Sequence, residues 1–238
     1  MTLNCEICNI SIIGGQMRKV SATKKLKVIE IKRRFIVVEK RALKEIALVA
    51  SAGVIRSEDL KVDVYDKEVV LLTGNNVSEL GILFLEEGGD EKNIKKVFVE
   101  EKTFLEKKLE AGDIVFISRG AHFRAAIVRE EDLRFDLLPS PNFLVIKVNP
   151  EQSAEVIVAY LNSFIGQQQL NHIAVGASLR NIPVGKLKDF NIPYLSQEKQ
   201  SALNTLFYKN IAALESILAL YTQQQRVFNA VISNLVEE

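Results

Sequence analysis

The sequence is poor in the residues from which metal sites, disulfide frameworks and many catalytic centres are built. Its 238 residues include two cysteines, two histidines and no tryptophan. Cys5 and Cys8 form a single C-x-x-C pair, which is half of a zinc site and needs a second ligand pair. Because His122 and His172 lie far from that pair and from each other, we expect no metal site and interpret the cysteines as reduced thiols.

The motifs of phosphate-binding and nucleophilic enzymes are also missing. The glycine pairs at 14–15 and 88–89 have neither G-x-G-x-x-G nor Walker A spacing. Two distant histidines supply no nucleophile–base pair. In "PSPNF" (139–143), Ser140 interrupts the proline pair of an adenine methyltransferase loop, and "EIK" (30–32) has no aspartate before it, as a nuclease site requires. We therefore expect a non-catalytic chain without a cofactor; a minimal nuclease or methyltransferase is the enzymatic alternative.

Long hydrophobic runs and a large net charge are absent as well. No run of 18 apolar residues occurs and the N-terminus lacks a signal peptide's apolar core, so no membrane span and a cytoplasmic location are expected. The formal net charge is +1, but eleven Lys or Arg face only Glu30 and Glu39 between Arg18 and Lys44. This basic segment indicates either a polyanionic partner or a solvated, lysine-rich surface.

Short apolar segments separated by polar turns occupy most of the first 196 residues, a pattern typical of β-strands. We expect strands within 28–41, 67–85, 114–117, 125–130 and 142–150. Residues 43–53 fit a short helix or a strand closed by Gly53, and 153–174 has the apolar spacing of a helix. The sequence therefore predicts an α+β chain, with a β-rich body, packed helices and a long C-terminal coiled-coil helix.

The C-terminal helix is predicted by a heptad pattern. Neither Pro nor Gly occurs between 194 and 238, and Ser196 and Glu198 suit the start of a helix. From Phe207 onward the apolar residues recur in alternating steps of four and three, with Gln225 as a polar member. We expect this seam to pair two copies of the chain, and the alternative is a helix folded back on its own body. The expected dimerisation residues are Ile211, Leu214, Leu218, Tyr221, Phe228, Ile232 and Leu235.

Three polar turns carry the side chains that suit DNA. Arginine pairs well with guanine and asparagine with adenine in the major groove, while serine suits phosphates. The turns are "GNNVS" (74–78), "SRGAHFR" (118–124) and "SLRNIP" (178–183). The expected DNA-binding residues are Asn75, Asn76, Ser78, Ser118, Arg119, His122, Arg124, Ser178, Arg180 and Asn181. Turn geometry for Asn and Gly, and solubility for Arg, are the alternative reasons for these residue types.

The order of these pieces resembles the target recognition domain of specificity subunits from Type I restriction–modification systems. The resemblance covers roughly residues 43–205 and is carried by "LKEIALVASAG", "EVVLLTGNNVSELG", "KKLEAGDIVFISRGAHFRAAIV" and "NFLVIKV". Its most specific stretch is "YLNSFIGQQQLNHIAVGASLRNIPVGKLKDFNIPYLSQEKQSAL" (160–203). The resemblance implies a non-catalytic DNA-reading subunit whose base-reading residues vary between members.

What the resemblance implies for partners follows from the family. Its specificity subunits hold two recognition domains separated by antiparallel helices, dock onto methyltransferase (modification) subunits that methylate adenine, and can recruit a restriction subunit. This sequence holds one such domain and one helix, so the resemblance implies a homodimer on double-stranded DNA with a gapped site. We divide the chain into a basic extension without family counterpart (1–41), a recognition domain (42–196) and a spacer helix (197–238). The final motif also departs from the family, with Tyr194 and Leu195 after Pro193 in place of a second proline.

A rival interpretation has the same fold but no specific DNA binding. The near-neutral net charge also suits a non-catalytic protein-interaction or inhibitor module that binds protein through its β-rich body. The two interpretations differ in salt dependence, because only a reader of DNA phosphates loses affinity steeply as salt rises.

Overall fold

In the computed structural model the chain forms two compact units, Met1–Val37 and Val38–Glu238. The structure describes residues 39–53, 67–85, 94–177 and 179–236, together with the backbone of 4–5, 10–13 and 16–19. In the first unit β1 (Asn4–Cys5), β2 (Ile10–Ile13) and β3 (Gln16–Lys19) form an antiparallel sheet in that order. The side chain of Cys5, all of Cys8 and most of the basic segment lie outside the described residues, so the interpretations placed on them stay predictions.

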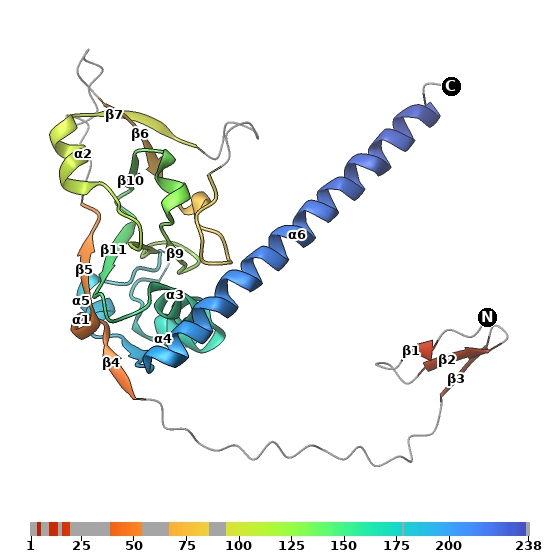
Figure 1. Cartoon of the computed structure of the whole chain (residues 1–238), viewed down its shortest axis with the longest axis horizontal. Helices are drawn as coiled ribbons and strands as arrows, with labels where there is room; N and C mark the ends of the chain where they lie inside the picture. Colours follow the sequence, from red (N-terminus) through yellow and green to blue (C-terminus); the bar gives the residue numbers. More distant parts are fainter. Residues whose placement is uncertain are drawn as a thin grey trace. The chain divides into compact units, whose positions relative to one another are not determined.

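A four-stranded antiparallel sheet forms the centre of the second unit (Figure 1). Its order is β5 (Ala47–Ser51), β11 (Phe143–Val148), β8 (Ile114–Ile117) and β9 (Ala125–Ile127). All four residues of β8 are buried, because successive side chains enter cores on opposite faces of the sheet. Ile114 and Phe116 belong to one apolar core, whereas Val115 and Ile117 belong to the other. The apolar run after Gly112 is thus a strand covered on both faces.

Two smaller sheets lie in the same unit. In one, β6 (Lys67–Leu72) pairs in parallel with β10 (Leu137–Pro139) and antiparallel with β7 (Lys96–Val99). In the other, β4 (Lys40–Ala42) pairs antiparallel with β12 (Asn191–Pro193), which joins the start of the unit to the strand just before the last helix. The final apolar strand of the sequence therefore closes the body.

Short helices cover the sheets and position the loops. They are α1 (Leu43–Ile46), α2 (Glu101–Lys107), α3 (Ala154–Asn162), α4 (Phe164–Ile173) and α5 (Val184–Lys188), with 3-10 turns η1 (Gly74–Asn76) and η2 (Glu130–Arg134). The single helix expected at 153–174 is two helices, because Ser163 ends α3 and caps α4 by accepting a 3.1 Å hydrogen bond from the N–H of Gly166. α2 lies in a stretch that we did not predict to be helical.

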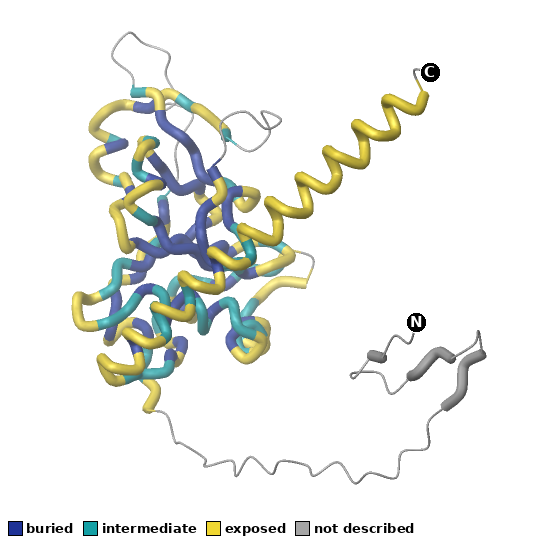
Figure 2. Tube along the Cα trace, turned by 45° about the vertical axis from the view of Figure 1, so that its right-hand side comes forward, coloured by how far each residue is buried: buried dark blue, intermediate teal, exposed yellow. Residues whose placement is uncertain are grey.

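The last helix, α6, runs from Gln197 to Val236 (Figure 1). Its start packs on α3, and the side chain of Ile211 is buried in the same core as β8 and α3, with Phe207 packed against that core. Beyond Ile211 the described helix is exposed apart from the half-buried Leu214 (Figure 2). The α+β class and the long C-terminal helix are confirmed.

The burial of Ile211 corrects one part of the predicted seam. Its side chain is 4% exposed because the chain's own body covers it. A residue already buried at that level has no surface left for a second chain, so the available seam begins at Leu214. The fold-back alternative thus describes the first third of α6 and not the rest.

Candidate nucleic-acid interface

Two of the three predicted turns lie side by side although they are about 60 residues apart in sequence. The loop 118–124 leaves β8, and 179–183 follows α4. The N–H of Gly120 donates to the carbonyl of Arg180 at 3.0 Å, and the N–H of Ile182 donates to the carbonyl of Ser118 at 2.8 Å. A bridge between Arg119 and Asn181 continues this pairing. The backbone therefore brings residues 118–120 and 180–182 side by side.

Two side-chain amides hold the far end of the same loop. Asn162 forms a two-way pair with Ala125, accepting from its N–H at 2.9 Å and donating to its carbonyl at 2.8 Å. Gln167 donates to the carbonyls of Phe123 and Leu161 at 2.6 and 2.7 Å. These amides replace the strand partner that the loop lacks, so the loop is fixed before any ligand binds. Sequence reasoning missed both amides, because each lies about 40 residues from its partner in the loop.

The third turn joins this surface through an ion pair. The guanidinium of Arg124 lies 2.8 Å from the carboxylate of Glu79, with 31% of the arginine side chain exposed. Glu79 directly follows the predicted "GNNVS" turn, so the turn lies beside loop 118–124. All three predicted turns therefore come together in the folded chain, although Ser178 itself lies outside the described residues.

Two predicted contacts are buried and are corrected here, and a third, Ser78, is half-buried. Asn76 is fully buried, where its side-chain oxygen accepts from the N–H of Thr73 at 2.8 Å. Ser118 is 3% exposed, and its hydroxyl donates to the carbonyl of Asn142 at 2.9 Å. The hydroxyl of Ser78 donates to the carbonyl of Ile82 at 2.8 Å. These polar groups hold the turns in shape, and the residue types alone did not reveal which way the side chains point.

Two further predicted residues, Arg180 and Asn181, make contacts within the protein. One amino group of Arg180 donates to the side-chain oxygen of Asn171 at 2.6 Å, and its guanidinium lies 5.2 Å from the ring centre of Phe123. Asn181 is half-buried, and its backbone N–H and carbonyl both pair with Val175. Their charge and polarity remain at the surface, but their geometry is set by these neighbours.

The side chains of Asn75, Arg119 and His122 are exposed, and no residue that the structure describes binds them. With Arg124 and Arg180, the loops carry three arginines and a histidine, and Glu79 pairs with Arg124. Such a surface attracts phosphate and offers donors to base edges. It has the chemistry of nucleic-acid binding and contains no nucleophile–base pair among its described residues.

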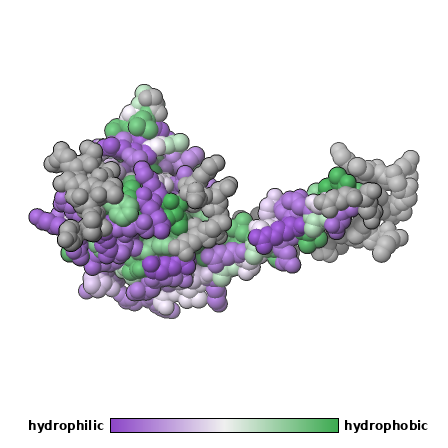
Figure 3. All heavy atoms as spheres, turned by 90° about the horizontal axis from the view of Figure 1, so that it is seen from above, coloured by the Kyte–Doolittle hydropathy of each residue, from purple (hydrophilic) through white to green (hydrophobic). Residues whose placement is uncertain are grey.

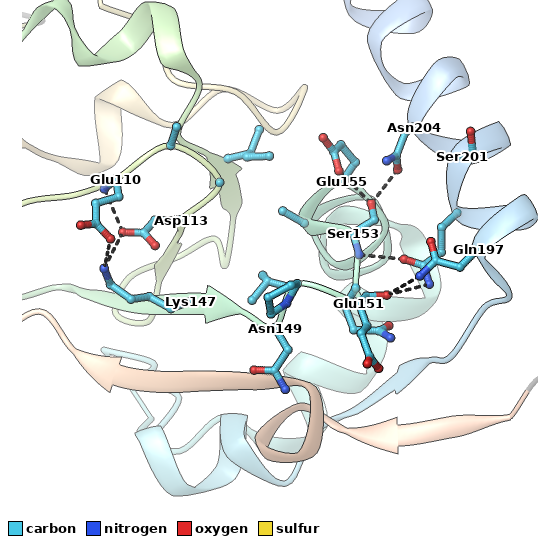
Figure 4. Close-up of a pocket in the computed structure, with 18 residues that line it drawn as sticks. Glu110, Asp113, Lys147, Asn149, Glu151, Ser153, Glu155, Gln197, Ser201 and Asn204 are labelled. Atoms are coloured by element: carbon cyan, nitrogen blue, oxygen red, sulfur yellow. Dashed lines mark hydrogen bonds and ion pairs between the residues drawn. The ribbon is translucent and has the colours of Figure 1, made fainter.

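The base of α6 is fixed to the body by a separate set of polar contacts (Figure 4). Gln200 is 5% exposed and accepts from the N–H of Ser153 at 2.8 Å, while donating to the carbonyl of Leu195 at 2.9 Å. One and two turns later, Asn204 lies 2.6 Å from the hydroxyl of Ser153, and the phenol of Tyr208 donates to Glu155 at 2.8 Å. With Ile211 below them, these contacts fix the direction in which α6 leaves the body.

A polar cleft of about 670 Å³ lies beside this base. Its other wall carries Lys147, whose ammonium lies 2.8 Å from Glu110 and 3.4 Å from Asp113. Burial raises the pKa of Asp113, whereas the hydrogen bond from Lys147 lowers the pKa of Glu110. Among the described residues every buried side-chain N or O atom has a partner, and these include the amide of Gln200 at the joint between α6 and the body.

Tyr208 makes the joint sensitive to alkaline pH. Partial burial of a side chain that is still 43% exposed, aided by the hydrogen bond to Glu155, raises the pKa of Tyr208 to about 12 from its usual 10.0. The folded state therefore holds the phenolic proton more tightly than the unfolded state does. This contribution to stability is present below pH 10 and is lost as pH rises towards 12. In urea unfolding between pH 9.5 and 11.5, the wild type should lose more stability than Tyr208→Phe. Equal losses in the two proteins would contradict this role for the phenol.

The described residues hold no group of three or more His, Cys, Asp or Glu arranged to bind a metal ion. In the part of the chain that the structure describes, no helix combines the length and apolar character of a membrane span.

Comparison with known proteins gives no match to a protein-family model and none to a curated protein. Among solved structures, the chain is similar to the S subunit of a Type I restriction–modification system from M. genitalium, with 17% identity over 75% of this chain and 42% of that one, and a TM-score of 0.44. It is also similar to the HsdS subunit from Thermoanaerobacter tengcongensis, with 12% identity over 75% of this chain and 39% of that one, and a TM-score of 0.48. The chain spans about two fifths of the length of these structures.

Proposed function

We propose that this chain is a non-catalytic, sequence-specific DNA-binding protein that directs a separate adenine methyltransferase, and in some complexes a restriction subunit, to a bipartite site. The observation that carries the proposal is the preorganised surface of loops 118–124 and 179–183 beside the 74–79 turn. Its exposed donors are held in place by backbone pairing and by the Asn162 and Gln167 amides. A surface fixed before binding loses little entropy on DNA, which favours specific recognition.

The roles of individual residues follow from their exposure. Arg119 and His122 are free to contact phosphates or guanine, and Asn75 is free to contact an adenine edge. Arg124 and Arg180 add positive charge from fixed positions. The chain binds no cofactor in this proposal, because the methyl donor belongs to the methyltransferase.

We also propose that the chain forms a homodimer with one recognition surface at each end, and the exposed seam of α6 supports this. Leu218, Tyr221 and Phe228 are 58%, 63% and 61% exposed, which is costly for a helix that stays alone in water. Apolar atoms are visible between hydrophilic ones along this helix (Figure 3). A two-fold dimer reads a site with two-fold related halves, and the helix pair sets the gap between them.

The loop assignment is tested by Arg119→Ala. The target duplex is first identified by methylome sequencing of cells that express the chain with a neighbouring methyltransferase. We expect affinity for that duplex to fall about tenfold. The slope of log K against log salt should become shallower by about one unit for each phosphate that Arg119 no longer neutralises in the two-fold dimer. Fluorescence anisotropy at several salt concentrations measures both effects.

The matched control is Lys102→Ala, which removes an exposed cation of α2 away from the proposed surface. It should leave the affinity and the salt slope of the wild type unchanged. Equal behaviour of the two variants would contradict the assignment of loop 118–124. A wild-type chain without any preference for the target over a scrambled duplex would instead favour the protein-interaction or inhibitor alternative.

A further inference from the structure

The spacing of the exposed seam on α6 restricts how two copies can pair. From Leu214 the seam residues follow in steps of four, three, four, three, four and three, ending at Leu235. In a helix pair every layer stays in line only where a step of four faces a step of four and a step of three faces a step of three. The heptad spacing therefore allows only a small set of registers for a pair of helices. The choice among them rests on the proposed homodimer.

The body of the protein excludes a parallel pair. At the levels of Phe207 and Ile211 the seam side of α6 is covered by the chain's own core. In a parallel pair the partner helix and the partner body would have to occupy that same volume. An antiparallel partner brings no second body to that level, and only the last residues of its helix, after Ile232, lie near it.

Among antiparallel registers, burial excludes one and leaves two that have six layers each. Setting Leu214 against the partner's Ile232 gives six layers, with Leu218 against the partner's Phe228 and Tyr221 against the partner's Gln225. The next layer would need Ile211, which is already buried. A shift by one heptad towards the body would require Phe207 and Ile211. A shift away from the body also gives six layers, and it leaves Leu214 in place of Leu235 without a partner.

The polar residues of the helix distinguish these two registers and favour the one in which Leu214 faces the partner's Ile232. Here the amide of Gln225 meets the phenol of the partner's Tyr221, so a hydrogen bond satisfies both groups. In the register shifted away from the body, Gln225 would meet the partner's Phe228 and could not form that bond. A polar pair in an apolar seam is a recognised means of fixing register.

The residues that flank the seam agree as well. Ile217, Gln224 and Val231 each precede a seam residue by one position, and Ile217 and Val231 are 59% and 51% exposed. In the selected register Ile217 lies beside the partner's Val231, and Gln224 lies beside the partner's Gln224. The shifted register would place Gln224 beside the partner's Val231. Apolar flanks thus meet apolar flanks, and the polar residues gather at the two-fold axis.

We infer that α6 pairs antiparallel with α6 of a second copy in this register, with the two-fold axis crossing the helix at Gln223 and the Tyr221–Gln225 pair fixing it. The two recognition surfaces then lie at opposite ends of the helix pair. Their separation is set by the length of α6 between Gln223 and the residues that fix its base to the body.

Cysteine cross-linking of the full chain tests the register. Both native cysteines are replaced (Cys5→Ser, Cys8→Ser), and differently tagged Leu218→Cys and Phe228→Cys chains are co-expressed and oxidised. A disulfide needs Cα atoms within about 7 Å, so only facing positions react. We expect the mixed pair to cross-link at least tenfold faster than Leu218→Cys alone, and than Leu218→Cys co-expressed with Leu235→Cys.

Each other outcome overturns the inference in a distinguishable way. Self-cross-linking of Leu218→Cys indicates a parallel pair, and a Leu218–Leu235 cross-link indicates the shifted register. A dimer by light scattering that forms none of these cross-links overturns the register and leaves the proposed homodimer standing. A monomer by light scattering overturns the register together with the dimer, while DNA binding by loop 118–124 is still judged by Arg119→Ala.

Discussion

Leu218→Asp is expected to make the protein monomeric and to weaken binding to its two-part DNA target by about 100-fold. Leu218 is 58% exposed on the part of α6 that its own body does not cover. An aspartate there would place a charge in the apolar seam of each partner, and burying it without a counter-ion is unfavourable. A monomer also cannot bind the second half-site, and in a linked pair that second binding event is worth a factor of about 10² to 10⁴.

Light scattering and anisotropy with the full target and with a single half-site duplex measure these two effects. Ala219→Asp is the matched control, because it adds the same charge at the next exposed position, away from the seam. The control should remain dimeric and bind the full target normally. If Leu218→Asp stays dimeric at micromolar concentration, the seam does not pair two copies.

Gly166→Ala is expected to cost about 3 kcal/mol of the free energy of unfolding, a large effect for one added methyl group. A Cβ at Gly166 would approach the carbonyl oxygen of Tyr160 far inside contact distance, and the two other nearest atoms are also backbone. Backbone atoms cannot rotate away as a side chain can. Relief requires separating α3 from α4, which also moves Gln167 and the loop that it holds.

Urea unfolding compares this variant with Gly185→Ala. Gly185 is also helical, in α5, and a Cβ there meets no atom within 4 Å. The control should be neutral or gain up to about 1 kcal/mol, as alanine favours helix over glycine. Similar unfolding free energies for the two variants would show that the α3–α4 junction is not tightly packed.

Periodic features of the chain were predictable from the sequence, and side-chain direction was not. The seam of α6 repeats over many turns, so its pattern identified the helix without reference to the rest of the chain. α2 was missed because it is seven residues long and charged, with Phe104 as its buried residue. A pattern that short gives little periodic signal.

The candidate interface also shows that the sequence does not reveal the direction of individual side chains. Turn residues located the three loops, because Gly and Asn are typical of turns wherever these lie. Sequence could not separate the exposed Asn75 from the buried Asn76 beside it. Nor could it associate Asn162 with Ala125, since that contact exists only after the central sheet and α3 have packed. Local chemistry therefore predicted where the turns are, and tertiary packing decides which of their side chains stay exposed.

Because the base of α6 is fixed to the body, a small movement there is amplified at the free end of the helix. Residues 200–211 anchor ~17 Å of it, and residues 212–236 extend it by ~37 Å. A sideways slip of ~1 Å at the anchor would swing the far tip by ~2 Å, more than half of the ~3.4 Å rise of one base pair. The hydrogen bonds of Gln200, Asn204 and Tyr208 fix the angle of the helix at this anchor. In the proposed complex with DNA, their rigidity would limit how accurately the spacing between two half-sites is set.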